Sequence, residues 1–307
     1  MILPASQRLH GLVAATHTPF HGDGSLNLGM VEKQAAHLIA NRVAAAFIGG
    51  TTGESHSMSL DERHALAQRW MEVTRGSTLR VVVHVGSNCL GDAATLARQA
   101  QKLGAAAVSA LAPSYFKPSS VEMLVDCCSQ IAGAAPGLPF YFYDIPSLTG
   151  VNLPMPEFLE KASARIPNLA GLKFTNPDLM SYQLCLRAAD GAFDVPWGTD
   201  EALLGALAVG ARGGVGSSYN FAAPIYHHVM AFFAKGDLDA AREVQFRSVR
   251  LIRTLAAYGY MGAAKAVMKM LGVDVGPARI PNGNLTGSQI TALREELERL
   301  EFFDGLG

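Results

Sequence analysis

Eight short apolar runs recur along the chain, and a segment with helical periodicity follows most of them. Most runs do not alternate strictly between apolar and polar residues, which is typical of parallel strands buried on both faces. Eight such units favour one closed (β/α)8 TIM barrel over an open doubly wound sheet. No Gly-x-Gly-x-x-Gly follows the first run, which argues against a dinucleotide-binding fold. The runs are Gly11–Ala15, Ala45–Gly49, Val81–Val85, Ala107–Leu111, Phe140–Ile145, Leu169–Phe174, Val195–Thr199 and Gly213–Ser217, of which Val195–Thr199 is the weakest because it is short and contains Pro196.

The strand pattern stops after about residue 221, and helical periodicity continues to the end of the chain. We therefore expect a barrel over residues 1–223 and a C-terminal helical extension over residues 224–307. The extension can pack on the barrel or supply a surface for an oligomer, and the pattern does not separate these roles. Its helices are expected over 224–271 and 287–300, on either side of a loop. Three capping boxes, in which a hydroxyl and a carboxylate or amide satisfy each other's backbone donors, are expected at Ser59–Glu62, Ser119–Glu122 and Thr286–Gln289.

Composition excludes several classes of function. The 307 residues carry a net charge of −1 and no basic run, so a nucleic-acid partner is not expected. No apolar run reaches the ~18 residues of a membrane helix, and residues 1–8 do not resemble a signal peptide. The four cysteines lack Cys-x-x-Cys spacing, which predicts reduced thiols and a cytoplasmic protein. The nine histidines show no metal-ligand spacing, so we expect no metal.

Lys173 is the residue with the most distinctive position. It ends the apolar run that begins at Leu169, and an amine at the end of a buried strand is costly to keep protonated. A neutral amine can attack a carbonyl carbon and form a Schiff base. An enzyme that works in this way needs no metal and no cofactor. The alternative is a lysine whose apolar stem is buried while its amine reaches solvent.

Polar residues and glycines follow other runs, at the strand ends where barrel enzymes hold their active sites. The loop Gly49–Glu54 combines glycines with Thr51 and Thr52, whose N–H and hydroxyl groups can bind an anion. Tyr143 can transfer a proton. Each feature also has a structural interpretation, as a glycine-rich turn, a core tyrosine or acids that cap a helix. Together they provide the amine, acid/base group and carboxylate site of an imine-forming enzyme. Other such residues are Tyr115, Gly198, Asp200, Glu201, Gly216 and Ser217.

Three motifs occur in an order and spacing that resemble a known family. They are Gly49-Gly-Thr-Thr-Gly-Glu54, Tyr143-Asp-Ile-Pro146 and Gly171-Leu-Lys173. The chain is similar over about its whole length to the pyruvate-dependent class I aldolases and synthases, which include dihydrodipicolinate synthase and N-acetylneuraminate lyase. The resemblance implies that Lys173 forms an imine with pyruvate. It also implies that Tyr143 is the acid/base group, and that Thr51 and Tyr115 complete its hydroxyl relay. Thr51 and Thr52 would hold the pyruvyl carboxylate. Tyr115 would reach a neighbouring subunit, which implies a homotetramer.

A few positions bear on the substrate. Synthases of this family generally carry arginine where this chain has Leu148, whereas sialic acid lyases carry leucine. The resemblance therefore implies cleavage of N-acetylneuraminate to N-acetylmannosamine and pyruvate. Alternatives are another pyruvate-dependent aldolase, synthase or dehydratase, or a non-catalytic pyruvate-binding regulator. Two residues depart from the pattern: Asp144 stands where many relatives have asparagine or histidine, and Trp197 is bulky beside the expected sugar site. Residues that match lyase positions for the sugar are Thr175, Gly198, Asp200, Glu201 and Ser217, and Gly216 lies in a lyase-like stretch.

Overall fold

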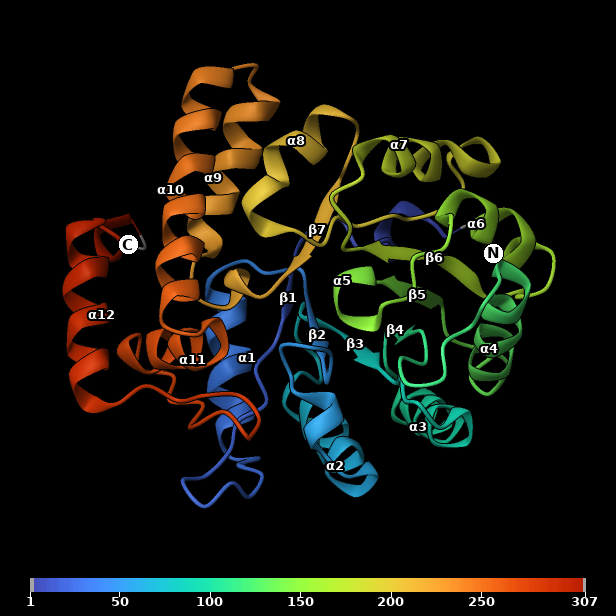
Figure 1. The fold of residues 1–307 in the computed structure, drawn as a ribbon, viewed down its shortest axis with the longest axis horizontal. Helices are drawn as coiled ribbons and strands as arrows, with labels where there is room; N and C mark the ends of the chain where they lie inside the picture. Colours follow the sequence, from blue (N-terminus) through green and yellow to red (C-terminus); the bar gives the residue numbers. More distant parts are fainter. Residues whose placement is uncertain (1–2, 306–307) are drawn as a thin grey trace.

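The computed structural model of the chain describes residues 3–305, in which seven parallel strands curl into a near-closed TIM barrel surrounded by helices (Figure 1). The hydrogen-bonded order is β6-β5-β4-β3-β2-β1-β7, so neighbours in sequence are mostly neighbours in the sheet. This architecture confirms the predicted barrel class. The strands are β1 (Gly11–Ala15), β2 (Ala45–Ile48), β3 (Arg80–His84), β4 (Ala107–Leu111), β5 (Phe140–Asp144), β6 (Leu169–Phe174) and β7 (Gly213–Gly216).

The predicted strand Val195–Thr199 is not a regular strand, so this prediction was wrong. The segment lies between β6 and β7, where only Trp197 forms bridges to both neighbours. Its N–H donates to the carbonyl of Gly213 at 3.0 Å, and its own carbonyl accepts from the N–H of Val215 at 2.7 Å. Pro196 has no N–H to donate, so a continuous ladder cannot form through it. The barrel is therefore closed here by an irregular segment.

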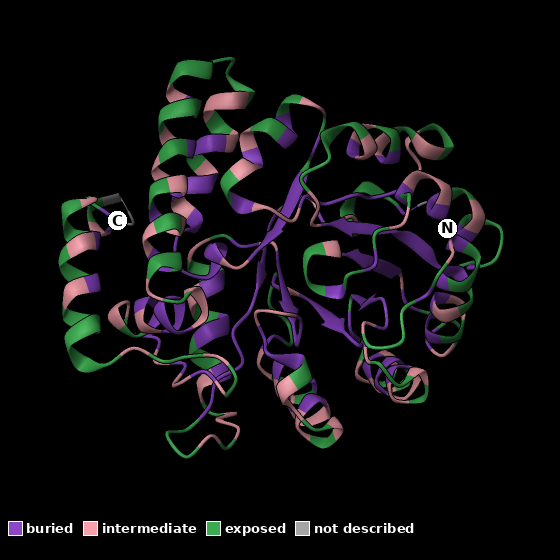
Figure 2. Ribbon diagram, in the orientation of Figure 1, coloured by how far each residue is buried: buried purple, intermediate pink, exposed green. Residues whose placement is uncertain are grey.

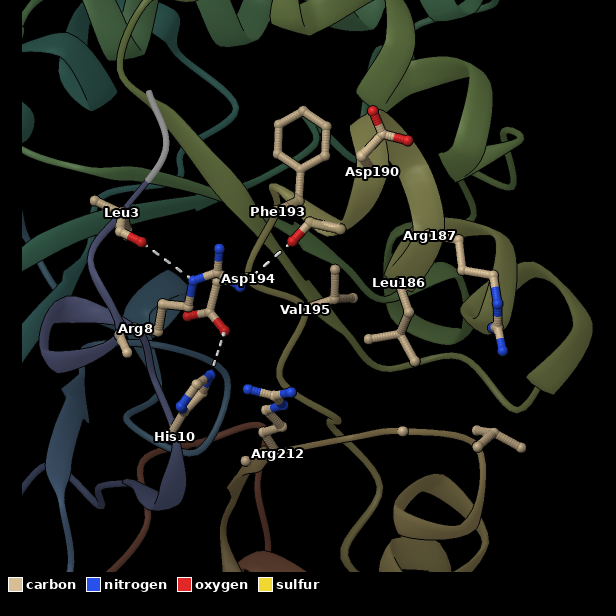
Figure 3. A pocket seen from close by; sticks show the side chains of 15 residues that line it. Leu3, Arg8, His10, Leu186, Arg187, Asp190, Phe193, Asp194, Val195 and Arg212 are labelled. Atoms are coloured by element: carbon tan, nitrogen blue, oxygen red, sulfur yellow. Dashed lines mark hydrogen bonds and ion pairs between the residues drawn. The ribbon is translucent and has the colours of Figure 1, made fainter.

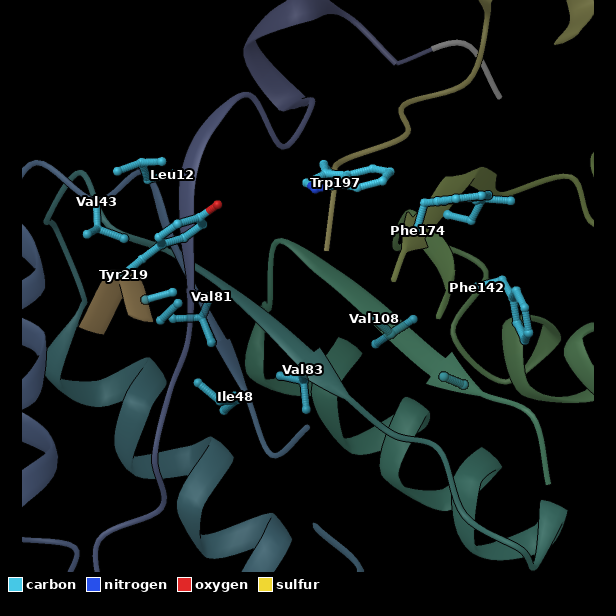
Figure 4. Close-up of a cluster of buried hydrophobic side chains, with 14 of the residues drawn as sticks. Leu12, Val43, Ile48, Val81, Val83, Val108, Phe142, Phe174, Trp197 and Tyr219 are labelled. Carbon is cyan, nitrogen blue, oxygen red and sulfur yellow. The ribbon is translucent and has the colours of Figure 1, made fainter. Parts of the chain in front are cut away.

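Buried apolar side chains form two clusters on the two faces of the sheet. The inner cluster fills the barrel and includes Val13, Phe47, Val82 and Val215. The outer cluster packs the sheet against the helices, whose outward faces are exposed (Figure 2, Figure 4). Each fully buried leucine or phenylalanine contributes roughly 1.5–3 kcal/mol. The continuous apolar runs are thus explained by burial on both faces.

A bulge in β6 turns Lys173 toward the barrel interior. Phe140 pairs with Leu169, but the next residue of β5, Tyr141, pairs with Gly171, so β6 carries one extra residue. Before the bulge Ala170 faces inward, and after it Leu172 faces outward. Without the extra residue the alternation of the strand would point residue 173 outward. Gly171 permits the bulge, because its φ is 155° and an added Cβ would lie 1.8 Å from the carbonyl oxygen of Asp194.

Helices cover the outside of the sheet, and their caps explain where several of them begin. The capping boxes at Ser59–Glu62 and Thr286–Gln289 are confirmed. The one predicted at Ser119–Glu122 was wrong: Ser120 is the N-cap and accepts from the N–H of Met123, so Glu122 comes one position too early. The helices are α1 (Met30–Ala40), α2 (Leu60–Val73), α3 (Leu90–Leu103), α4 (Val121–Gly133), α5 (Pro146–Thr149), α6 (Met155–Ser163), α7 (Leu179–Arg187), α8 (Leu203–Ala208), α9 (Ala223–Ala234), α10 (Leu238–Ala257), α11 (Tyr260–Met270) and α12 (Gly287–Arg299).

The last four helices gather on one side of the barrel, beside β1 and α1 (Figure 1). α9 packs against α10 and contacts β1 and α8. Residues 1–2 and 306–307 lie outside the described residues. They are the two ends of the units expected over 1–223 and 224–307, and residues 1–2 also begin the segment that was compared with a signal peptide. Over residues 3–305, no helix has the length and apolar character needed to cross a membrane.

Candidate active site

Lys173 lies inside the barrel near the carboxyl end of β6 and is buried. Its Nζ is 3.9 Å from the centre of the Tyr143 ring and 4.7 Å from the centre of the Phe47 ring. These contacts hold the nitrogen against two aromatic faces. They also fix the direction of a flexible side chain, so the nitrogen has a defined position from which to attack a carbonyl carbon.

Tyr143 places its hydroxyl beside the loop that follows β2. Its Oη is 3.4 Å from Oγ1 of Thr51, a distance at the long limit of a hydrogen bond. The ring also packs edge-on against Phe47 and His84. The structure therefore brings Lys173, Tyr143 and Thr51 together, from β6, β5 and the end of β2. An amine, a phenol and a hydroxyl in this arrangement can form an imine and transfer a proton.

His84 was not singled out from the sequence, although it ends a strand at the same edge of the sheet. It is fully buried, and its Nε2 accepts from the N–H of Leu111 at 3.3 Å. Its Nδ1 lies 2.9 Å from the carbonyl of Gly49, to which it therefore donates. Burial lowers the pKa of His84 well below its usual value, and the charges of Arg63, His56 and Lys173 act in the same direction. His84 is thus a neutral link between Tyr143, against whose ring it packs, and the loop after β2.

The loop after β2 presents both threonines at the mouth of the barrel. Thr51 and Thr52 are half-buried, and Gly53 packs so closely on Gly49 that an added Cβ would lie 2.9 Å from the Gly49 nitrogen. The N–H of Glu54 donates to the carbonyl of Thr51 at 3.0 Å, which closes a tight turn. This turn can offer N–H and hydroxyl groups to a small anion.

Thr175 and Gly198 meet just beyond β6. An added Cβ on Gly198 would lie 1.9 Å from Oγ1 of Thr175, so only glycine fits beside this hydroxyl. The Oγ1 atom is buried and has no hydrogen-bond partner within the described residues. An unsatisfied buried hydroxyl is unfavourable, because it loses its bonds to water without replacement. Thr175 is therefore available to bond with a ligand.

Asp200 lies buried beneath the segment that follows β7. Its Oδ2 accepts from the backbone N–H of Ser218 at 2.8 Å and from its hydroxyl at 2.5 Å. An added Cβ on Gly216 would lie 1.8 Å from Oδ1, so Gly216 makes room for the carboxyl group. Burial raises the pKa of Asp200 to about 6, and the hydrogen bonds from Ser218 oppose this rise. Glu201 is exposed.

Ser217 is held by a residue that sequence reasoning missed. Its hydroxyl lies 2.7 Å from that of Tyr260, the first residue of α11. Burial raises the pKa of Tyr260, so it stays protonated at neutral pH. No local signal marked Tyr260, because its link to Ser217 spans 43 residues and depends on how α11 packs.

Tyr115 is the one predicted catalytic residue that the described chain does not place with the others. Tyr115 is 78% exposed, and its ring packs edge-on against Phe116, which is 85% exposed. The Oδ1 of Asn88 accepts from its backbone N–H at 3.0 Å and fixes the loop. Two adjacent aromatic residues that are exposed to this degree form a surface suited to contact with another chain.

The two residues that departed from the family pattern lie outside the barrel. The Trp197 ring packs on Phe174 and Tyr182, between the sheet and α7, so it does not obstruct the site (Figure 4). The Asp144 carboxylate accepts from Asn176 at 3.3 Å, and it interacts electrostatically with Cys185 of α7. Burial raises the pKa of Asp144 to about 7, and the hydrogen bond from Asn176 opposes this rise.

A cavity of about 610 Å³ opens at the opposite end of the barrel (Figure 3). Its lining includes Arg8 and His10, which precede β1. It also includes Asp194, which precedes the irregular segment Val195–Thr199, and Arg212, which precedes β7. Arg8 is already bonded to three backbone carbonyls. Chemistry in such barrels occurs at the carboxyl ends of the strands, so this cavity is separate from the site around Lys173. Residues 3–305 hold no cluster of three or more metal-ligating side chains.

A parallel barrel that gathers an amine, a phenol and hydroxyls at the carboxyl ends of its strands is an arrangement for enzymatic chemistry. The model of the dihydrodipicolinate synthetase family matches residues 8–300. The chain therefore belongs to the dihydrodipicolinate synthetase family.

Two relatives in this family are N-acetylneuraminate lyases. N-acetylneuraminate lyase A of Xenopus laevis is 40% identical over 280 residues, which cover 90% of this chain and 92% of the relative. The structure of the lyase from Aliivibrio salmonicida is 44% identical, with a TM-score of 0.93 over 96% of this chain and 98% of that one. A dihydrodipicolinate synthase from Cyanidioschyzon merolae is 29% identical, with a TM-score of 0.88 over 95% of this chain and 98% of that one.

Proposed function

We propose that the protein is a class I aldolase that cleaves N-acetylneuraminate to N-acetylmannosamine and pyruvate. The observation that carries this proposal is the buried Lys173 amine, 3.9 Å from the centre of the Tyr143 ring, beside the hydroxyl of Thr51. The two lyases are 40% and 44% identical to this chain, whereas the synthase is 29% identical. The site therefore supports an imine-forming enzyme, and the relatives support the lyase over a synthase.

The reaction begins when the Lys173 amine attacks C2 of the open-chain sugar acid. Loss of water gives an imine whose protonated nitrogen accepts electron density. Tyr143, or the substrate carboxylate, takes the proton from the C4 hydroxyl, and the C3–C4 bond breaks. This step releases N-acetylmannosamine and leaves an enamine on Lys173. Protonation at C3 and hydrolysis then release pyruvate and restore the amine.

The sides of the barrel mouth suit the two ends of this substrate. Thr51 and Thr52 would bind the pyruvyl carboxylate, while Thr175, Gly198, Asp200, Glu201, Gly216 and Ser217 would face the hydroxylated tail. Carboxylates accept hydrogen bonds from hydroxyls, so Asp200 and Glu201 suit a polyhydroxylated chain. Leu148 is exposed and uncharged, so it cannot hold a second carboxylate as an arginine would.

A homotetramer in the cytoplasm completes the proposal. The exposed pair Tyr115 and Phe116 supports a subunit contact through which Tyr115 would reach the site of a neighbour. The four cysteines are free thiols, which is compatible with a reducing compartment. The chemistry described uses only groups of the protein and its substrate.

A steady-state assay tests the proposed substrate. The enzyme should release pyruvate from N-acetylneuraminate and show little condensation of pyruvate with aspartate semialdehyde, because Leu148 provides no cation for the second carboxylate. Cleavage of a different 2-oxo sugar acid alone would favour another aldolase of the family. Binding of pyruvate without turnover of any such acid would favour the regulator.

The acid limb of the pH profile, in which kcat/KM falls as the pH is lowered, should follow the protonation of Asp200. The pKa of Asp200 is raised to about 6, so its carboxylate becomes protonated as the pH falls below that value. The protonated group is a weaker hydrogen-bond acceptor for the substrate hydroxyls. We expect kcat/KM for N-acetylneuraminate to fall there by up to about tenfold per pH unit, because this parameter follows ionisation of the free enzyme.

Two amide variants decide whether Asp200 causes the limb. Asp200→Asn should lower kcat/KM at pH 8 and lack the limb near pH 6. Asp144→Asn is the matched control, since its carboxyl lies outside the barrel, and it should retain the limb. A limb that persists unchanged in Asp200→Asn would assign it to another group.

A further inference from the structure

A buried ion pair joins the loop after β2 to helix α11. Nζ of Lys265 lies 2.7 Å from Oε1 of Glu54, and the two side chains are 2% and 0% exposed. The ammonium group also donates to the carbonyls of Thr18 and Pro277, both at 2.9 Å. Burial lowers the pKa of Lys265, and attraction to Glu54 opposes this effect. Loss of either partner would leave the other charge buried without its opposite charge.

The second oxygen of Glu54 is also bound by residues beyond the strands. Oε2 accepts from the backbone N–H of Arg279 at 2.8 Å and from Nδ2 of Asn282 at 3.2 Å. Lys265, Arg279 and Asn282 all come from α11 or the loop that follows it. The C-terminal extension therefore holds both oxygens of one carboxylate on the loop that presents Thr51 and Thr52.

The backbone of Glu54 links this carboxylate to the shape of the loop. Glu54 has φ 55° and ψ 38°, a left-handed conformation that residues other than glycine rarely adopt. Its N–H closes the turn onto the carbonyl of Thr51 at 3.0 Å, and Oγ1 of Thr18 donates to the carbonyl of Gly53 at 2.6 Å. The bonds of the Glu54 side chain offset this unfavourable backbone conformation and keep the turn closed.

We propose that Lys265 and Glu54 are positioning residues, through which the C-terminal extension holds Thr51 and Thr52 in place to bind the substrate carboxylate. Neither residue touches the substrate. The inference rests on the proposed function, because it takes the loop as the carboxylate site. It differs from a purely structural role, in which the pair only anchors the extension.

The test measures pyruvate binding separately from stability. Lys265→Met, Glu54→Gln and the double variant are titrated with pyruvate in the presence of borohydride, and adduct formation on Lys173 is followed by peptide mapping. Each single variant should raise the half-saturating pyruvate concentration by roughly tenfold or more, the effect of losing about one charged hydrogen bond. The double variant should show an increase similar to that of one single variant, because the two residues act as a unit.

Leu293→Ala is the matched control for stability. Leu293 is fully buried in α12, and its truncation should lower the unfolding temperature without moving the loop or the half-saturating concentration. Asn282→Ala removes only one donor from Glu54, and should raise the half-saturating concentration by a smaller factor. This variant keeps the inference testable if Lys265→Met does not fold.

The possible outcomes separate the inference from the function on which it rests. A wild-type half-saturating concentration in Lys265→Met and Glu54→Gln, with a lowered unfolding temperature, would overturn the inference alone. If Lys265→Met does not fold, an unchanged value in Asn282→Ala and Glu54→Gln would do the same. Absence of trapping on Lys173 in the wild-type protein would overturn the proposed function and the inference together.

Discussion

Replacement of Lys173 by methionine should abolish cleavage of N-acetylneuraminate. Methionine keeps an unbranched apolar stem of similar length but has no amine, so no imine can form. Removal of a covalent nucleophile lowers kcat by up to about 10⁶-fold in other enzymes. We expect a loss near this size, measured as pyruvate release in a coupled assay.

Lys173→Arg separates the charge of the residue from its nucleophilicity. Arginine stays protonated and can still lie over the Tyr143 and Phe47 rings, but it cannot form the imine. It should be as inactive as the methionine variant. Substantial activity in either variant, with the protein folded, would mean that Lys173 does not form the covalent intermediate.

Tyr143→Phe should lower kcat by about 10²–10⁴-fold, the usual contribution of an acid/base group. Phenylalanine keeps the ring over Lys173 and beside His84 but removes the hydroxyl that lies 3.4 Å from Thr51. Imine formation with pyruvate should therefore survive in part, while turnover falls. The two effects are measured by borohydride trapping and by steady-state kinetics.

Tyr141→Phe provides a matched control on the same strand. Tyr141 is also buried and belongs to the inner cluster, but its hydroxyl donates to Asp194 at 2.7 Å, near the other end of the barrel. Its loss should reduce stability and leave kcat near the wild-type value. Equal kinetic effects of the two variants would indicate that Tyr143 is needed only for packing.

The fold was largely predictable because it follows from local patterns. Strands buried on both faces require apolar runs, and seven of the eight predicted runs are strands. The eighth run, Val195–Thr199, is not a regular strand, because Pro196 has no N–H to donate. It pairs with β6 and β7 through bridges at Trp197. At α4 the N-cap is Ser120 rather than Ser119, a one-residue difference that depends on where the chain turns into the helix.

The site was predictable only in part. Lys173, Tyr143 and Thr51 meet because parallel strands end at one edge of the barrel, which the order of the motifs implies. The bulge at Gly171 turns Lys173 inward. A glycine within a strand is compatible with a bulge, but it does not by itself fix the register that places the extra residue there. The ion pair of Glu54 with Lys265 joins residues 211 positions apart and depends on tertiary packing. The same is true of His84 and Tyr260.

The imine on Lys173 can be tested most directly by reductive trapping. The wild-type protein is incubated with N-acetylneuraminate and borohydride, inactivation is followed over time, and the modified protein is mapped by peptide mass spectrometry. A cleaved substrate should leave a reduced pyruvyl group on Lys173 and on no other lysine, in step with the loss of activity. The absence of an adduct, or an adduct confined to another lysine such as the buried Lys265, would contradict the proposed mechanism.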